Sequence, residues 1–102
     1  MDVKRLNDSA EEAAEFLKAL AAPGRLRVLC LLSSGEHSVT ALAEAMGAPQ
    51  PTVSRHLTLL KKDGIVASRS SGATRFYRIA DVRVEKLMRL LYESFCEKKP
   101  DP

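Results

Sequence analysis

A chain of 102 residues, 45% hydrophobic and 28% charged, has the size and composition of one soluble globular domain with a modest core. It has no run of about 18 apolar residues that could span a membrane, and its polar N-terminus lacks the apolar segment of a secretory signal. We therefore expect one domain over residues 1–102, no membrane contact and a cytoplasmic location. Two cysteines in that reducing compartment do not form a structural disulfide framework.

The net charge of +3 is unevenly distributed along the chain. Residues 49–80 carry six Lys and Arg against one acidic residue, whereas residues 1–48 carry five against seven and residues 81–102 are balanced. A basic block between such flanks is typical of a surface that binds phosphate. The sequence lacks paired catalytic carboxylates, a nucleophile–base set and a phosphate-binding loop, so it does not indicate an enzyme.

The first third of the chain is expected to form two helices. The first covers about residues 9–21 and begins at Asp8 or Ser9, either of which can cap it, while residues 1–7 are expected to be loose. Pro23 starts the second helix, "PGRLRVLCLLSS", because proline fits the first helical position.

Two further helices are expected before the basic hairpin. Ser38 is expected to cap a short helix, "VTALAEAM", which Gly47 ends. The next helix, from about Gln50 to Lys62, has an apolar stripe at helical spacing that should pack inward and leave polar side chains outside. The residues of this stripe are Val53, Leu57 and Leu60.

The last third combines a hairpin with a long helix. Two β-type runs flank "SSGA" and predict a hairpin over about residues 65–79. Asp81 is expected to cap a helix over about residues 81–98, followed by a loose proline-containing end at 98–102. The sequence therefore predicts a mainly α fold with a β-hairpin wing, in which residues 38–63 form a helix-turn-helix.

The second helix of this helix-turn-helix has the side chains needed to contact DNA. Short polar side chains and an arginine occupy its first two turns, where base edges of a major groove are within reach. Lysines follow where phosphate contact is more plausible, and arginines flank the wing tip. We expect double-stranded operator DNA as a partner, with these candidate contact residues: Gln50, Thr52, Ser54, Arg55, His56, Thr58, Lys61, Lys62, Arg69 and Arg75.

The two histidines have several interpretations. His56 could pack within the helix-turn-helix, contact a phosphate or bind a metal. His37, in "GEHSV", is expected to be a solvated loop residue.

Two segments, "PQPTVSRHLTLLKKDGIVASRSSGATRFYRI" and "ALAAPGRLRVLCLL", carry a family pattern. They resemble the recognition helix with its wing, and the second helix, of the ArsR-type winged-helix repressors. This resemblance covers residues 9–97 and implies a homodimer through the first and last helices that releases a palindromic operator when an effector binds. The apolar surface expected on those helices is consistent with pairing. Pro49 stands where relatives often have a capping serine.

The metal-binding positions of this family are poorly matched. Ser38 and Thr40 replace the two cysteines of its "CVC"-type site, and no histidine follows Asp81 to complete a site on the last helix. A divalent metal needs three or four thiolate, imidazole or carboxylate ligands, so we assign no metal and no cofactor. A metal-responsive repressor is one alternative, and a winged helix used for protein contact is another.

Cys30 in "VLCLL" and Cys96 in "SFC" resemble the sensing pair of an ArsR subgroup that responds to persulfides and other reactive sulfur species. The resemblance implies a dithiol, joined by a disulfide or short polysulfide bridge when oxidised, that controls operator affinity. Lys98 and Lys99 lie beside Cys96 in the sequence, so we expect Cys96 to attack first and Cys30 to be the resolving partner. The alternative is that Cys30 is a small buried hydrophobe and Cys96 is incidental.

Overall fold

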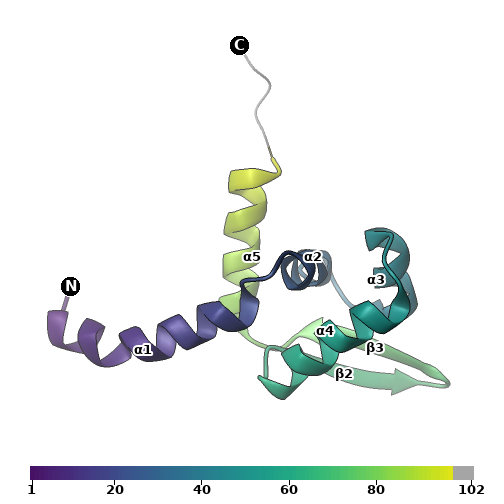
Figure 1. The fold of residues 1–102 in the computed structure, drawn as a ribbon, viewed down its shortest axis with the longest axis horizontal. Helices are drawn as coiled ribbons and strands as arrows, with labels where there is room; N and C mark the ends of the chain where they lie inside the picture. The colour runs from purple at the N-terminus through teal and green to yellow at the C-terminus, as the bar shows by residue number, and fades with distance from the viewer. Residues whose placement is uncertain (98–102) are drawn as a thin grey trace, which may run out of the picture.

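The computed structural model describes residues 1–97, which form five helices and a three-stranded antiparallel sheet (Figure 1). The strand order in the sheet is β1-β3-β2. This arrangement confirms the predicted winged helix-turn-helix and adds one short strand to it. The elements are α1 (Val3–Leu20), α2 (Pro23–Leu32), β1 (His37–Ser38), α3 (Val39–Met46), α4 (Gln50–Lys62), β2 (Val66–Ser71), β3 (Thr74–Ile79) and α5 (Val82–Phe95).

The core lies where α2, α3, α4 and the first half of α5 pack together against the sheet. The apolar stripe of α4 is fully buried, as its spacing predicts. Burial of each such side chain contributes about 1.5–3 kcal/mol, so this stripe fixes which face of α4 remains outside. The fully buried side chains are Val28, Leu29, Leu42, Val53, Leu57, Leu60, Val84 and Met88.

Side-chain caps start two of the helices, α3 and α5, at the predicted places. The Ser38 hydroxyl accepts a hydrogen bond from the backbone N–H of Ala41, at 3.1 Å, and so begins α3. The Asp81 carboxylate accepts one from the N–H of Arg83, at 2.9 Å, and begins α5. Pro49 occupies the cap position of α4, which therefore has no side-chain cap.

The start predicted for the first helix is wrong. α1 begins at Val3, because the Asp2 carboxylate accepts hydrogen bonds from the backbone N–H groups of Lys4 and Arg5, at 3.0 and 3.2 Å. Asp8 and Ser9 lie within the helix instead of capping it. Residues 3–7 contain no glycine or proline that would interrupt a helix, so α1 extends back to the cap at Asp2.

The predictions for His37 and for the last helix are also wrong. His37 lies in β1, half-buried and paired with Tyr77 of β3, because the segment before α3 adds a third strand to the hairpin. α5 ends at Phe95, with Cys96 at its C-cap, so the helix is shorter than the predicted 81–98. The predicted loose end at 98–102 lies outside the described residues.

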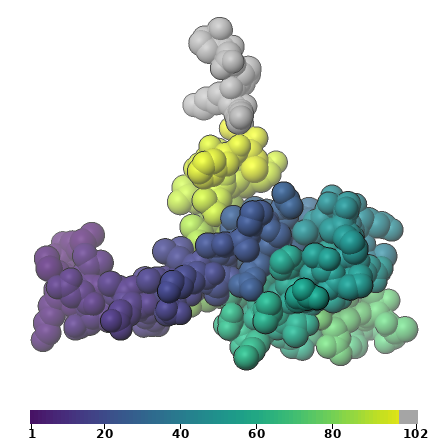
Figure 2. All heavy atoms as spheres, in the orientation of Figure 1, coloured from purple at the N-terminus to yellow at the C-terminus, as the bar shows by residue number. Residues whose placement is uncertain are grey.

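Two helices extend from the globular body. Figures 1 and 2 show the N-terminal part of α1 leading away from the domain and the C-terminal part of α5 rising from it. Both carry apolar side chains that this chain does not cover, including Leu17, Leu90 and Phe95, which are 51%, 57% and 70% exposed. Within residues 1–97, no helix is both long and apolar enough to cross a membrane.

Candidate DNA interface and cysteine pair

The outer face of α4 carries the polar side chains that the sequence assigned to base contact. Because the apolar stripe faces the core, the side chains between its members are exposed, except for the half-buried His56. The exposed candidates on this helix are Gln50, Thr52, Ser54, Arg55, Thr58, Lys61 and Lys62.

Hydrogen bonds hold some of these side chains in place. The Gln50 side-chain amide donates to the Thr40 hydroxyl at 3.1 Å, which joins the start of α4 to α3. The Thr58 hydroxyl donates to the Ser54 carbonyl within α4, at 2.9 Å. At the other end of the helix, the Lys61 ammonium donates to the Ser68 hydroxyl of β2 at 2.8 Å. α4 is therefore joined by polar contacts to α3 at its start and to the wing at its end.

The two arginines of the wing have different surroundings. Arg75, next to the hairpin turn, is exposed and forms no ion pair among the described residues. Arg69 forms an ion pair with Glu36, with its Nη2 atom 2.7 Å from Oε1, and its guanidinium lies 5.0 Å from the centre of the Phe76 ring. Hydrogen bonding to Arg69 lowers the pKa of Glu36. Arg75 is thus available for phosphate contact, whereas the Arg69 charge is already paired.

His56 lies against the start of α2. A Cβ atom built on Gly24 would overlap the His56 ring, so the two helices approach closely at this point. Burial, followed by the charges of Arg25 and Arg55, lowers the pKa of His56. A neutral, half-buried imidazole is a poor phosphate ligand, so this placement favours the packing interpretation. Nothing in the sequence near Gly24 indicated this contact, because it depends on how α2 and α4 cross.

Cys30 and Cys96 line the same apolar hollow, with a volume of about 450 Å³, between α2 and the end of α5. Cys30 is half-buried and Cys96 is exposed. Burial raises the pKa of the Cys30 thiol, and the nearby charge of Cys96 raises it further. The remaining lining consists of Leu26, Leu91, Tyr92 and Phe95.

The Cys30 thiol also contacts a third sulfur atom. Its Sγ donates to the Sδ atom of Met88, at 3.8 Å, and Met88 is fully buried in α5. Sulfur is a weak donor and a weak acceptor, so this contact orients the thiol more than it stabilises the fold. The predicted lysine neighbours of Cys96, Lys98 and Lys99, lie outside the described residues.

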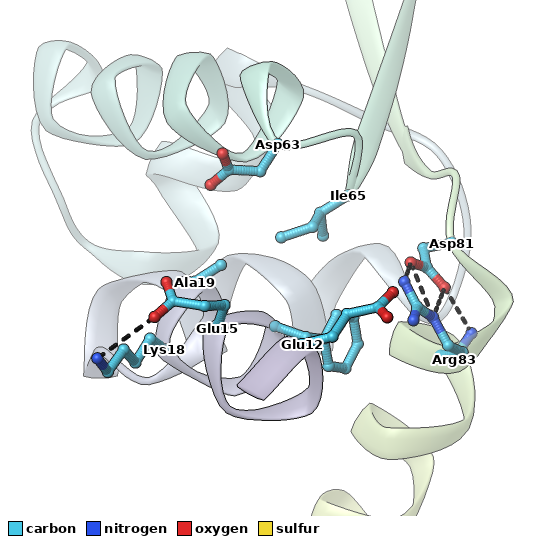
Figure 3. Close-up of a pocket in the computed structure, with 9 residues that line it drawn as sticks. Glu12, Glu15, Lys18, Ala19, Asp63, Ile65, Asp81 and Arg83 are labelled. Atoms are coloured by element: carbon cyan, nitrogen blue, oxygen red, sulfur yellow. Dashed lines mark hydrogen bonds and ion pairs between the residues drawn. The ribbon is translucent and has the colours of Figure 1, made fainter. Parts of the chain in front are cut away.

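A second hollow, of about 490 Å³, lies between α1, the end of α4 and the start of α5 (Figure 3). Four carboxylates line it against two basic side chains, Lys18 and Arg83, so its net charge is negative and it does not suit a phosphate backbone; the carboxylates are those of Glu12, Glu15, Asp63 and Asp81. Arg83 forms an ion pair with Asp81 at 2.7 Å, and its guanidinium lies 4.4 Å from the centre of the Phe16 ring of α1. These contacts join α1 to the start of α5. Over residues 1–97, no group of three or more His, Cys, Asp or Glu side chains is arranged to hold a metal ion.

Comparison with known proteins identifies the family. The family sequence model described as bacterial regulatory protein, arsR family, matches residues 22–68. A biofilm growth-associated repressor of Xylella fastidiosa is 39% identical over 88% of this chain and 79% of its own length. The chain belongs to the ArsR family. An uncharacterised HTH-type transcriptional regulator of Methanocaldococcus jannaschii is 44% identical over 81% of this chain and 94% of its own length.

Solved structures agree with this membership. The repressor BigR from Xylella fastidiosa has a TM-score of 0.87 and 37% identity, over 96% of this chain and 100% of that one. Reduced HlyU from Vibrio cholerae has a TM-score of 0.86 and 32% identity, over 92% and 99%. A homodimeric winged helix-turn-helix domain from Mycobacterium bovis has a TM-score of 0.73 and 38% identity, over 88% and 83%. This ArsR-family chain is therefore a DNA-binding transcriptional regulator of the winged helix-turn-helix type.

Proposed function

We propose that this protein is a homodimeric repressor whose affinity for operator DNA is controlled by a covalent bridge between Cys30 and Cys96. The observation that carries the proposal is that these two thiols, distant in the sequence, line one apolar hollow. Operator DNA and a reducing thiol pool occur together in the cytoplasm, where we expect the protein to act.

The homodimer is supported by the uncovered apolar faces of α1 and α5. Helices that expose several large apolar side chains are typical of a surface that pairs with another copy of the chain, so these faces suit a two-fold interface. The related domain from Mycobacterium bovis is described as homodimeric. Two-fold pairing would place the two α4 helices about 34–36 Å apart, one turn of DNA, on a palindromic operator.

The DNA contacts in this proposal follow from the exposure of each side chain and from whether its charge is already paired with a carboxylate. Gln50, Thr52, Ser54 and Arg55 contact base edges from the first turns of α4, because these positions enter the major groove in helix-turn-helix proteins. Exposed side chains later in α4 and on the wing contact phosphates, which fixes the position of the protein without reading the base sequence. His56 and Arg69 are omitted from both groups because one packs on α2 and the other is paired with Glu36. The phosphate-contacting residues are Thr58, Lys61, Lys62 and Arg75.

The bridge forms by thiolate attack on a persulfide, R–S–SH. The Cys96 thiolate attacks the outer sulfur, giving Cys96–S–SH and releasing R–S⁻, which takes up a proton. The Cys30 thiolate then attacks the Sγ atom of Cys96, forming the disulfide and releasing HS⁻. The two protein thiols are oxidised and one sulfane sulfur is reduced to sulfide. Each further sulfur inserted into the bridge converts one more R–S–SH into R–SH.

The geometry favours Cys96 as the first nucleophile. Cys96 is exposed, whereas Cys30 is half-buried, and burial raises the pKa of the Cys30 thiol above its ordinary value. Extra sulfur atoms lengthen the bridge, which relaxes the Cα–Cα separation of under about 7 Å that a plain disulfide requires.

The bridge would affect DNA binding through α2. This helix packs against α3, α4 and α5, so joining it to the end of α5 links the proposed dimer helix to the helix-turn-helix. A change of about 1–3 kcal/mol in conformational preference alters operator affinity by roughly 5- to 150-fold.

The experiment compares operator affinity before and after treatment with an organic tetrasulfide. Wild-type protein is expected to lose affinity on treatment, whereas Cys30→Ser and Cys96→Ser are each expected to bind DNA and to stay bound. Tyr92→Phe, which alters the same hollow without removing a thiol, is the matched control and is expected to respond like wild type. Release of the DNA by treated Cys30→Ser would contradict the proposal.

A further inference from the structure

The ion pair between Arg69 and Glu36 crosses the whole sheet of the wing. Arg69 lies on β2 and is paired in register with Phe76 of β3, which is in turn paired with Ser38 of β1. Glu36 precedes Ser38 by two residues, and side chains two apart in an extended segment share a face. The arginine therefore passes over the Phe76 ring and reaches a carboxylate at the far edge of the sheet.

The geometry of this contact is that of a specific clamp. Arg69 donates from Nε and Nη2 to the Glu36 carboxylate, over distances of 2.7 to 3.0 Å. Two-atom donation from a planar guanidinium fixes direction as well as distance. The nearby charge of Arg78 also lowers the pKa of Glu36, so the carboxylate remains ionised.

The clamp joins the wing to the segment that begins the helix-turn-helix. Glu36 lies in the connection between α2 and β1, and Ser38, two residues later, caps α3. We propose that Glu36 is a positioning residue for DNA binding: its ion pair with Arg69 fixes the wing relative to the helix-turn-helix. Arg69 therefore acts through wing orientation, and phosphate contact from the wing falls to Arg75.

A positioning role for Glu36 and simple repulsion of DNA by Glu36 predict opposite effects of Glu36→Gln on operator affinity. Removing a carboxylate from a DNA-binding surface ordinarily raises affinity, because it removes repulsion from the phosphates. If Glu36 only repels DNA or competes for Arg69, Glu36→Gln strengthens operator binding. If Glu36 positions the wing, the same substitution weakens operator binding.

The first experiment measures operator affinity of the full chain, kept reduced with dithiothreitol, on a duplex selected from random sequences. Glu36→Gln is expected to weaken operator binding roughly two- to fivefold, a small effect because an exposed ion pair contributes little. The matched control is Glu44→Gln, since Glu44 is exposed on α3 and has no ion pair among the described residues. The control is expected to bind equally well or better. Tighter binding by Glu36→Gln would overturn the inference.

The second experiment measures the salt dependence of the same affinity. Arg75→Ala is expected to reduce the slope of log affinity against log salt by about 0.9 per protomer, the value for one phosphate contact. Arg69→Ala is expected to weaken binding and leave the slope unchanged. A reduced slope for Arg69→Ala would show that Arg69 contacts phosphate and would overturn the inference.

A charge exchange separates positioning from simple loss of stability. The single variants Arg69→Glu and Glu36→Arg are expected to bind operator weakly, and the double variant is expected to recover affinity because the ion pair is restored in reverse. A double variant no better than Arg69→Glu would contradict the clamp. All variants are compared at a temperature where circular dichroism shows them folded. Because every sample is reduced, the outcome does not depend on the proposed thiol control.

Discussion

The close approach of α2 and α4 at Gly24 allows a prediction with a calculable magnitude. A Cβ atom added at this position would overlap the Nε2 atom of His56 and lie 3.0 and 3.2 Å from two further ring atoms. The neighbour is a half-buried ring between two packed helices, so Gly24→Ala must displace either the ring or α2. Overpacking of this kind costs about 1–3 kcal/mol. The gain in helix propensity from glycine to alanine offsets at most about 1 kcal/mol.

The net expectation for Gly24→Ala is a loss of about 1–2 kcal/mol in the free energy of unfolding. In a domain of this size, such a loss lowers the midpoint of thermal unfolding by roughly 5–15 °C. The assay is thermal unfolding followed by circular dichroism at one fixed protein concentration, because a dimer unfolds at a concentration-dependent temperature. Arg27→Ala, an exposed site on the same helix, is the control and should change stability by less than about 0.5 kcal/mol.

The decisive comparison is made in the His56→Ala background. Once the ring is removed, the added methyl group has space, so Gly24→Ala should become neutral or stabilise by up to about 1 kcal/mol. The double-mutant cycle should therefore give a coupling energy of about 2 kcal/mol between the two sites. Equal destabilisation by Gly24→Ala in both backgrounds would refute the packing role of His56.

Three other predictions concern DNA contact, assembly and thiol chemistry. Arg55→Ala should weaken operator binding by about 1–3 kcal/mol and leave binding to a scrambled duplex nearly unchanged; equal losses on both duplexes, measured at one salt concentration, would contradict base contact. Leu17→Asp should shift the protein towards a monomer in analytical ultracentrifugation because this exposed leucine belongs to the proposed interface, and unchanged sedimentation would exclude α1 from it. In the Cys96→Ser variant, Cys30 should be alkylated with a pH midpoint above that of free cysteine. The thiolate is the form that reacts, and burial still raises the pKa of Cys30 when Cys96 is absent. A midpoint at or below that of free cysteine would contradict the effect of burial.

The parts of the fold that sequence analysis predicts are those with local causes. The stripe of Val53, Leu57 and Leu60 fixes the buried face of α4 by its spacing alone. Ser38 and Asp81 start helices through hydrogen bonds to residues two or three positions away. Such features depend on a short stretch of chain, so they can be inferred without tertiary contacts.

The features that sequence analysis missed depend on contacts between residues far apart in the chain, or on several residues that could each begin the same helix. β1 has two residues, and it is a strand only because it pairs with β3, some forty residues later in the chain. Arg69 was identified as a charge near the wing tip, but its partner Glu36 lies 33 residues earlier. At the N-terminus, sequence analysis chose Asp8 or Ser9 as the cap, whereas the equally acceptable residue type at Asp2 begins the helix.

The prediction of the cysteine pair came from a family resemblance. Nothing in the spacing of Cys30 and Cys96 requires proximity, and their shared hollow results from the packing of α5 against α2. The two thiols differ in exposure, because Cys30 is half-buried in α2 and Cys96 is exposed at the end of α5.

Peptide mapping of the oxidised protein shows whether Cys30 and Cys96 are joined. Trypsin releases Cys30 in the peptide 28–55 and Cys96 in the peptide 90–98, because cleavage follows arginine or lysine. After treatment of the wild-type protein with an organic persulfide and blocking of free thiols, non-reducing mass spectrometry should find these two peptides joined, directly or through added sulfur. A mixture of isotopically light and heavy protein should give joined pairs of one label only, as expected for a bridge within one protomer. Recovery of both peptides with separately blocked thiols would contradict the account.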